Sequence, residues 1–439
     1  MWSGKAIASH ASSDDEPRPR GRRYARPVLT RRQTLKAALA TGVTGLVRGE
    51  ADFPPVRCLT RPPGHHWFGY YDKLQFDKTD RLALGMRVRF EHRTPATEDE
   101  LEIGLVDTGA GDAWRRLGSS SSWGWQQGCM LQWLPGDSGQ VIWNDREDGQ
   151  FISRVVDAHS LEQRVLPHPV YSVAPNGLWA ITADFARIQA LRPGYGYVGL
   201  EDPHADELVP EGTGVFRLDL MSGERELVVS IARMAALEPR SADMEGAKHY
   251  VNHLLVSPDG ERIVFLHRWR PDGGRAGFRT RMLTSSPSGE DLYVLDPSGT
   301  TSHFIWRDGE SLLAWSRPEG KPRGFYLFRD LSDEVSPVGE GVLTQDGHIS
   351  YVPGHDGWLL TDTYPDRERR EQRPMLFHEP TGRLVPLGRF HSPPEYRGEW
   401  RCDTHPRTSR DGRRVVIDSP HGGEGRQMWE IDVGAILDT

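Results

Sequence analysis

The stretch "RCDTHPRTSRDGRRVVID", residues 401–418, contains an Arg-Asp-Gly turn followed by a short run rich in β-branched residues. That order is typical of one strand, a tight hairpin turn and a second strand. Six further stretches share the pattern: "FDKTDRLALGM", "LPGDSGQVIW", "APNGLWAIT", "SPDGERIVFL", "WRDGESLLAW" and "VPGHDGWLLT". An outer strand-like segment accompanies each hairpin, such as "LEIGLVDTGAGD" in the first unit and "MWEIDVGA" in the last. Seven such units predict an all-β fold, a seven-bladed β-propeller formed by residues 60–435 as a single domain.

The composition agrees with a large β architecture. The chain has 439 residues, of which 37% are hydrophobic and 26% charged, and its 47 glycines and 32 prolines supply many turns. The formal net charge is -8, and neither the composition nor the clustering of basic residues provides the basic face that binds phosphates, so we expect no nucleic-acid partner. The three cysteines, Cys58, Cys129 and Cys402, cannot form a disulfide framework. We expect the protein to be a monomer.

The N-terminal region differs from the rest of the chain. Residues 1–29 are polar and rich in arginine and proline, without periodicity, which predicts disorder. Within residues 30–50, Arg31 and Arg32 precede a short, weakly apolar stretch at 37–47, which resembles a twin-arginine export signal. Such a signal predicts a periplasmic or secreted protein; the alternative is a basic amphipathic helix on a cytoplasmic one. The apolar stretch is too short to span a membrane, so no integral membrane segment is expected.

Histidines recur at one position of the repeat. The first strand of each propeller blade lines the central channel, so equivalent positions of different blades surround one axis. A lone histidine on a strand is usually structural, but three at one equivalent position should reach a common volume and predict a metal site. The residues five positions before the second residue of each turn are Asp72, Met130, Val170, His253, Ser302, His348 and His405.

Two residues could complete the ligand set of His253, His348 and His405. Cys402 and Gln345 each lie eight positions before the reference residue of their turn. Coordination by the Cys402 thiolate would favour zinc, which we expect. Coordination by Gln345, with Asp346 or Asp403 nearby, would make manganese or calcium plausible. In the alternative interpretation the histidines form a polar plug that packs the channel.

Two of these motifs carry a resemblance to a known family. The segments "HLLVSPDG" at 253–260 and "QDGH" at 345–348 resemble those of the seven-bladed propeller polysaccharide lyases, of the oligogalacturonate lyase and ulvan lyase types. The resemblance implies that His253, Gln345 and His348 bind a divalent metal. It also implies cleavage of uronic-acid-containing poly- or oligosaccharides by β-elimination. The chain has Ser350 where that family tends to have another histidine, and His405 of the next blade could replace it.

A lyase needs a group that neutralises the uronate carboxylate, a base, and an acid for the leaving oxygen. The stretch "VYSVAPNGLWAITADFARIQALRPGYGY", residues 170–197, offers Arg187 as the neutraliser, because a guanidinium pairs with a carboxylate through two hydrogen bonds. The resemblance implies a tyrosine and histidine pair for proton transfer, with Tyr171 or Tyr195 as the tyrosine and His66 as the histidine. Tyr171 as a core residue and Arg187 as a structural ion-pair partner are the alternatives. Further residues predicted to bind substrate are Gln127, Arg192 and Arg268.

Other functions remain open at this point. The sequence has no GxSxG motif, P-loop or dinucleotide-binding fingerprint, so the propeller is not coupled to those catalytic modules. A non-catalytic periplasmic scaffold or carbohydrate-binding protein is the main alternative to a carbon-oxygen lyase, and a metal-dependent hydrolase is a third. The partner that we expect is an acidic poly- or oligosaccharide.

Overall fold

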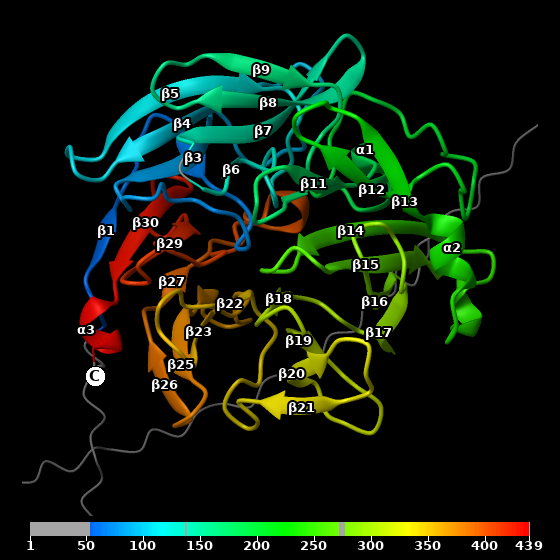
Figure 1. The fold of residues 1–439 in the computed structure, drawn as a ribbon. Coiled ribbons are helices and arrows are strands. Elements are labelled where there is room, and N and C mark those ends of the chain that lie inside the picture. The colour runs from blue at the N-terminus through cyan, green and yellow to red at the C-terminus, as the bar shows by residue number, and fades with distance from the viewer. Residues whose placement is uncertain (1–52, 137, 272–276, 439) are drawn as a thin grey trace, which may run out of the picture. The chain divides into compact units, whose positions relative to one another are not determined.

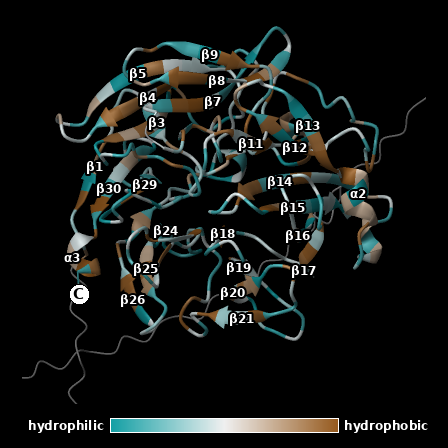
Figure 2. Ribbon diagram, viewed as in Figure 1, coloured by the Kyte–Doolittle hydropathy of each residue, from teal (hydrophilic) through white to brown (hydrophobic). Residues whose placement is uncertain are grey.

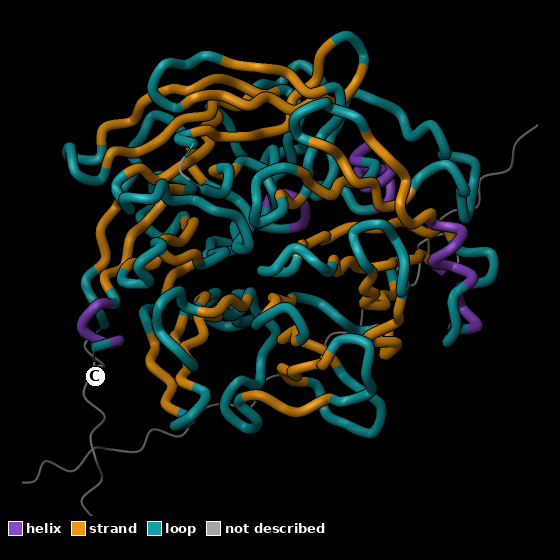
Figure 3. The backbone as a smooth tube through the Cα atoms, in the orientation of Figure 1, coloured by secondary structure: helices purple, strands orange, loops and turns teal. Residues whose placement is uncertain are grey.

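The computed structural model describes residues 53–136, 138–271 and 277–438, and these form a seven-bladed β-propeller (Figure 1). Seven four-stranded antiparallel sheets follow one another around a ring. Helices are few and short, as the tube in Figure 3 shows, and strands account for 41% of the described residues against 6% for helix. The predicted all-β class and blade number are therefore confirmed.

The strands of the first four blades run from the ring axis outward in chain order. Blade one contains β2 (His65–Trp67), β3 (Leu82–Val88), β4 (Leu101–Asp107) and β5 (Ala113–Ser120). Blade two contains β6 (Gln132–Trp133), β7 (Gln140–Glu147), β8 (Gln150–Asp157) and β9 (Gln163–Leu166). Blade three contains β10 (Ser172–Val173), β11 (Trp179–Thr182), β12 (Gly214–Asp219) and β13 (Arg225–Ser230). Blade four contains β14 (Lys248–Val256), β15 (Ile263–Arg270), β16 (Arg279–Ser285) and β17 (Tyr293–Gly299).

The last three blades follow the same plan with one exception. Blade five contains β18 (Phe304–Trp306), β19 (Ser311–Ser316), β20 (Gly324–Arg329) and β21 (Val335–Val338). Blade six contains β22 (Ile349–Tyr351), β23 (Trp358–Thr361), β25 (Met375–His378) and β26 (Arg383–Pro386). Blade seven contains β28 (Arg407–Thr408), β29 (Arg414–Ser419), β30 (Gln427–Asp432) and, as its outermost strand, β1 (Val56–Cys58).

Short elements decorate the loops between these strands. β24 (Glu371–Gln372) pairs with β27 (Phe390–His391) in a small separate sheet. The helices are α1 (Phe185–Leu191), α2 (Ile231–Ala236) and α3 (Gly434–Leu437), with single 3₁₀ turns at Ala242–Met244 and Gly398–Trp400. Among the described residues, no helix combines the length and the apolar character that crossing a membrane would require.

The seven predicted turns join the two inner strands of the seven blades, and serine-containing turns in blades four and seven have the same structure. In the turn between β28 and β29, the Ser409 N–H donates to the Arg414 carbonyl at 2.9 Å, and the Gly412 N–H donates to the Ser409 carbonyl at 3.0 Å. Ser257 makes the equivalent bond to Arg262 at 2.8 Å in blade four. Gly412 has a φ of 73°, a conformation that glycine adopts without the steric cost other residues pay.

The outer strands differ from the prediction. One outer strand per blade was expected, whereas each blade has two beyond its inner hairpin. In blade four the stretch "LYVLDPSGT" is the fourth strand, β17, and the third strand, β16, lies before it with the sequence "RTRMLTS". Outermost strands such as β9, with the sequence "QRVL", are only partly buried, so their sequences lack the strong apolar pattern of the inner strands.

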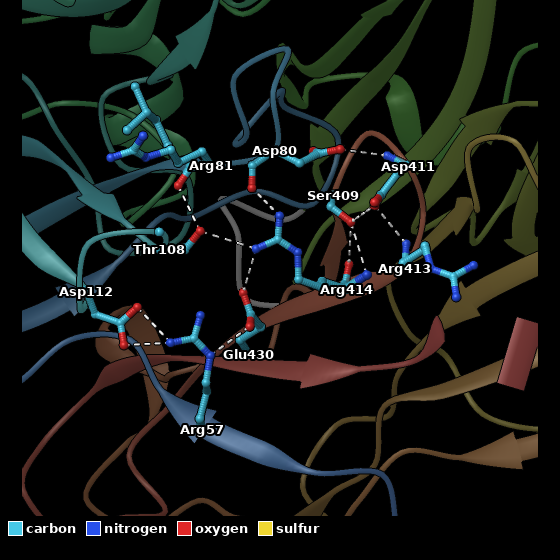
Figure 4. A network of polar contacts seen from close by, with 12 residues as sticks. Arg57, Asp80, Arg81, Thr108, Asp112, Ser409, Asp411, Arg413, Arg414 and Glu430 are labelled. Atoms are coloured by element: carbon cyan, nitrogen blue, oxygen red, sulfur yellow. Dashed lines mark hydrogen bonds and ion pairs between the residues drawn. The ribbon is translucent and has the colours of Figure 1, made fainter. Parts of the chain in front are cut away.

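The ring closes through β1, which pairs with β30 in the register Arg57 to Glu430. The propeller therefore begins before residue 60, and its last blade combines both ends of the described chain. A polar network supports the closure (Figure 4): Arg57 donates to Glu430 at 2.8 Å and to Asp112 at 2.6 Å, while Arg414 reaches Glu430 at 3.1 Å. The Arg414 guanidinium also donates to the backbone carbonyl of Asp80, which ties blade seven to blade one.

The apolar core lies within and between the blades, where Figure 2 shows brown segments along the strands. A large cluster joins blades one and two around Trp67, Trp123 and Trp125, with the rings of Trp67 and Trp125 5.4 Å apart. The disorder predicted for residues 1–29 and the export signal predicted for 30–50 lie outside the described residues.

Candidate functional site

The three histidines singled out by the repeat meet near the ring axis, around the ring of Tyr70. The Tyr70 ring centroid lies 5.0 Å from that of His253, 5.4 Å from His405 and 6.2 Å from His348. All four side chains are buried. Tyr70 belongs to an irregular excursion between β2 and β3, so blade one supplies an aromatic residue where blades four, six and seven supply imidazoles.

The inward orientation of two of these histidines comes from an unusual backbone conformation. His253 has a φ of 53° and lies where the pairing of β14 with β15 shifts register between Asn252 and Leu255. His405 has a φ of 39° just before β28, and Met130 has a φ of 56° at the equivalent place of blade two. A left-handed conformation costs a residue with a side chain about 1 to 2 kcal/mol. Left-handed backbone, and not the strand alternation on which the prediction rested, aims these side chains.

A compact group of potential metal ligands lies within this cluster. One ligand atom each from His348, Asp403 and His405 lies within 4.8 Å of the other two, and all three residues are buried. Asp403 Oδ1 and His405 Nε2 have no hydrogen-bond partner among the described residues. An unpartnered buried polar atom costs free energy, and a cation bound between these atoms would remove that cost. The chemistry of two imidazoles and a carboxylate fits a divalent cation.

The orientation of His348 supports the same interpretation. Its Nδ1 lies 3.0 Å from both carboxylate oxygens of Asp362, and the Asp362 Oδ1 also accepts the His348 backbone N–H at 2.7 Å. Thr404 donates its hydroxyl to the same carboxylate. A histidine that donates Nδ1–H to a carboxylate presents Nε2 as a lone pair, which is the usual arrangement of a histidine that binds a metal.

The other predicted ligands lie outside this group of three. His253 Nε2 is 3.3 Å from the Tyr71 hydroxyl and 3.6 Å from a carboxylate oxygen of Asp72. Gln345 is exposed to solvent. Cys402 is buried, and burial raises the pKa of its thiol, which keeps it protonated despite the nearby Arg426 guanidinium. No described contact brings the Cys402 sulfur to the imidazoles, so the expectation of zinc loses the thiolate on which it rested.

Tyr195 lies between two arginines beside the candidate metal ligands. Its hydroxyl oxygen accepts a hydrogen bond from Arg401 Nη2 at 2.6 Å, and the Arg192 guanidinium lies 4.2 Å from its ring centroid. Burial alone would raise the pKa of the Tyr195 phenol, but the Arg401 and Arg192 charges lower it to about 7. Arg401 Nε donates to Asp403 Oδ2 at 2.7 Å, so one guanidinium connects the phenol to the ligand group. A phenol that ionises near neutral pH can act as a base.

The guanidinium groups of Arg192 and Arg268 lie over the same aromatic ring near Tyr195. The Phe278 ring lies 4.4 Å from the guanidinium of Arg192 and 4.8 Å from that of Arg268. Arg268 is 5% exposed, and its Nε and Nη1 groups have no partner among the described residues. Burial lowers the pKa of Arg268, because the charged guanidinium has lost contact with water. A bound carboxylate would satisfy these N–H groups in the geometry that guanidinium favours.

Arg187, predicted to neutralise the substrate carboxylate, has no N–H group left for that role. It is 1% exposed and donates through Nε to the His249 carbonyl at 2.7 Å. Its two Nη groups donate to Asp202 at 2.9 Å and to the carbonyls of three residues, His204, Glu207 and Leu208. The geometry matches the structural alternative, in which Arg187 holds the loop that follows α1.

Tyr171 and Gln127 support the backbone near His253. The Tyr171 hydroxyl accepts the His253 backbone N–H at 2.8 Å and donates to Gln127 Oε1 at 2.9 Å. Burial raises the pKa of Tyr171, so this phenol stays protonated. Gln127 Nε2 remains without a partner among the described residues. Of the two predicted tyrosines, only Tyr195 combines an ionisable phenol with neighbouring cations.

His66 lies on β2, away from the three candidate ligands. Its Nδ1 is 2.9 Å from Gln427 Oε1, and its ring packs edge-on against Trp114 with centroids 5.0 Å apart. Burial lowers the pKa of His66 to about 4. The contacts place it between blades one and seven, where it has no described contact with Tyr195.

Sequence reasoning missed several polar residues at the ring axis. His303 lies one position after the repeat-equivalent Ser302, and its ring packs 4.3 Å from that of His348. Arg401 lies two residues before Asp403, which the sequence had placed near the site only as a companion of Gln345. Tyr364, after β23, packs 5.9 Å from His348 and carried no motif.

Two oligogalacturonate lyases are among the solved structures to which this structure is similar. An oligogalacturonate lyase in complex with manganese aligns with a TM-score of 0.63 and 15% identity, covering 89% of this chain and 96% of that one. The oligogalacturonate lyase of Vibrio parahaemolyticus aligns with a TM-score of 0.62 and 13% identity, covering 87% and 94%. At these identities the similarity shows the fold. No family model matches the sequence, and no curated protein does.

Proposed function

We propose that this protein is a polysaccharide lyase that cleaves uronic-acid-containing poly- or oligosaccharides by β-elimination with a bound divalent metal. The observation that carries the proposal is the position of Tyr195, whose phenol oxygen accepts a hydrogen bond from Arg401 at 2.6 Å while the Arg192 guanidinium lies 4.2 Å from its ring. These two cations lower the pKa of the phenol, and a phenol that ionises more easily suits removal of the proton alpha to a carboxylate.

The roles follow from the contacts. A cation held by His348, Asp403 and His405 would supply positive charge that withdraws electrons from the substrate carboxylate and makes the neighbouring C–H more acidic. Arg268 and Arg192 would bind the carboxylate through their unpartnered N–H groups. The Tyr195 phenolate, kept ionised by Arg401, would then remove the proton.

Manganese is the metal that we propose in place of zinc. The residues that lie together offer nitrogen and oxygen ligands without a thiolate, and manganese accepts both donor types. The similarity in fold to a lyase that was crystallised with manganese supports this choice.

The test is an assay for the unsaturated uronate, which only elimination produces and which absorbs in the near ultraviolet. Purified protein loaded with manganese should generate this absorbance on at least one of a panel of uronate polymers, including oligogalacturonate and ulvan. Tyr195→Phe should abolish it, whereas Tyr293→Phe should not, because Tyr293 contacts Asp333 at the outer edge of blade four. New reducing ends without absorbance would instead identify a hydrolase, and binding without cleavage would identify a carbohydrate-binding scaffold.

The cellular location is a separate part of the proposal. A substrate of this kind is extracellular, which agrees with export directed by Arg31 and Arg32. Replacing both with lysine should leave the protein in the cytoplasm. Unchanged fractionation of that variant would refute the export signal.

A further inference from the structure

Tyr364 belongs to a hydrogen-bonded chain that the roles above do not use. Its hydroxyl lies 3.3 Å from His303 Nε2, and His303 Nδ1 lies 2.9 Å from Asp346 Oδ1. The three residues come from separate places in the fold: His303 precedes β18, Asp346 precedes β22 and Tyr364 follows β23. Blades five and six therefore assemble a tyrosine, a histidine and an aspartate in line.

These three hydrogen-bonded residues lie directly beside the candidate metal ligands. The His303 ring centroid is 4.3 Å from that of His348, and the Tyr364 ring centroid is 5.9 Å from it. Tyr364 is partly exposed, whereas His303 is 5% exposed. Tyr195 comes from blade three and Tyr364 from blade six, so the two phenols approach the ligand group from different parts of the ring.

The partners of His303 determine which way the hydrogen bonds point. The Asp346 carboxylate can only accept, so His303 carries its proton on Nδ1 and donates it there. The other nitrogen, Nε2, is then an acceptor, and the Tyr364 hydroxyl must donate to it. Tyr364 is thereby held as a neutral phenol with its hydrogen in a defined position. Tyr195 is the opposite case, because its oxygen accepts from Arg401.

We propose that Tyr364 is the general acid of the elimination, and that His303 and Asp346 are positioning residues that hold its hydroxyl. The inference rests on the proposed lyase function and assigns the acid that the function requires. Two phenols in opposite hydrogen-bonding environments divide the two proton transfers between them.

The bond changes balance without a further reagent. Tyr195 removes the proton alpha to the carboxylate, and the C–H electron pair forms the new carbon-carbon double bond. The bond from the beta carbon to the glycosidic oxygen breaks, and its electron pair stays on that oxygen. The oxygen takes the phenolic proton of Tyr364, whose hydroxyl turns from His303 toward the substrate. The proton gained by Tyr195 equals the one lost by Tyr364, so exchange with solvent restores both phenols.

The test compares two leaving groups. One substrate carries the natural glycosidic oxygen, which needs a proton to depart; the other carries 4-nitrophenoxide at the same carbon, which departs without one. Tyr364→Phe should lower kcat on the glycosidic substrate at least 100-fold, in line with the usual contribution of general acid catalysis, and change it less than about threefold on the nitrophenyl substrate. Tyr195→Phe should lower both rates. Circular dichroism and a melting curve establish that each variant is folded.

The positioning residues are tested with Asp346→Asn, at a partly exposed position where little packing is lost. The amide can donate to His303 and reverse its tautomer, so the Tyr364 hydroxyl loses its acceptor. We expect kcat on the glycosidic substrate to fall about tenfold with KM unchanged, and the nitrophenyl rate to stay the same. Equal losses on both substrates, or no loss on either, in Tyr364→Phe would overturn the assignment while the lyase function stands. If the wild-type protein eliminates neither leaving group, the lyase function itself is refuted.

Discussion

Replacing Arg401 with glutamine should raise the pKa of Tyr195 and move the acid limb of the pH-rate profile to higher pH. Arg401 Nη2 lies 2.6 Å from the Tyr195 oxygen, and its guanidinium carbon lies 5.7 Å from the ring centroid. The side chain of Arg401 is 27% exposed, so its charge is only partly screened by water. Glutamine keeps an N–H donor and much of the length but removes the charge.

The size of the effect follows from these distances. Two unit charges about 4 Å apart interact with about 4 kcal/mol at an effective dielectric constant of about 20. Since one pKa unit corresponds to 1.36 kcal/mol, this is an upper limit of about three units, and the donor that glutamine retains reduces it to about two. The Tyr195 pKa would rise from about 7 to about 9, so the ionised fraction at pH 7 would fall from about one half to about 1%. Turnover at pH 7 should drop about 50-fold.

The assay is the elimination rate from pH 5 to 10, together with an ultraviolet difference titration of tyrosinate in the same variant. Activity of Arg401→Gln should recover at pH 9, because the base needs only to be ionised. Arg413→Gln is the matched control, since that arginine is 44% exposed and its ion pair within the described part of the chain is with Asp438. An acid limb that stays within half a unit of the wild-type value, with activity lost at every pH, would show that Tyr195 is not the base that titrates.

Three further results are expected. In elemental analysis of protein purified without added metal, Asp403→Asn should have lost most of the bound divalent metal, whereas Cys402→Ser should retain it. If the wild-type protein contains less than about a tenth of an equivalent of metal, the imidazoles form a polar plug and not a metal site. Arg414→Met should lower the free energy of unfolding in urea by about 2 kcal/mol, because the Arg414 guanidinium bridges Glu430 and the backbone of blade one. Arg413→Met, at an exposed ion pair, should lower it by less than about 1 kcal/mol. Equal losses in the two variants would contradict a role for the network in closing the ring. Burial lowers the pKa of His66 in the folded protein to about 4, so between about pH 6.5 and 4 the unfolded state binds more protons and stability falls as the pH falls. His66→Asn should remove this contribution and make the fall in stability less steep by up to about 1.4 kcal/mol per pH unit. An unchanged slope in melting curves measured across this range would refute the prediction.

The propeller could be predicted from the sequence because its inner hairpins carry strong local signals. Turns such as "SRDG" and "SPDG" sit between apolar runs, and the same hydrogen bonds form in both. The outermost strands could not be predicted in this way, since β9 and β21 are half exposed and need no apolar alternation. β1 was missed for another reason: its partner β30 lies at the other end of the chain, and no local pattern reports such a pairing.

The site was partly predictable. The repeat position brought three histidines together at Tyr70. The choice between Cys402 and Asp403 as a companion of His405 could not be made from the sequence, because residues 401–406 are not a strand and His405 has a left-handed φ of 39°, so alternation does not report which side chains share a side. Arg187 matched the chemistry of carboxylate binding, and only its five structural acceptors reveal that it is fully occupied. Contacts between separate blades, such as Arg401 with Tyr195, have no counterpart in a local pattern.

The pairing of β1 with β30 has a consequence for how the chain reaches its native state. Arg57 and Glu430 are 373 positions apart, and bringing two such segments together costs about 5 kcal/mol of loop-closure entropy. β1 is synthesised before the other strands of blade seven, but it finds its partner only after β30 has left the ribosome. Until then six blades can form from local hairpins while the seventh lacks its outer strand. Refolding from urea should therefore show a slow final phase that reports on blade seven alone, and cutting the chain within β1 should remove that phase without preventing the earlier ones.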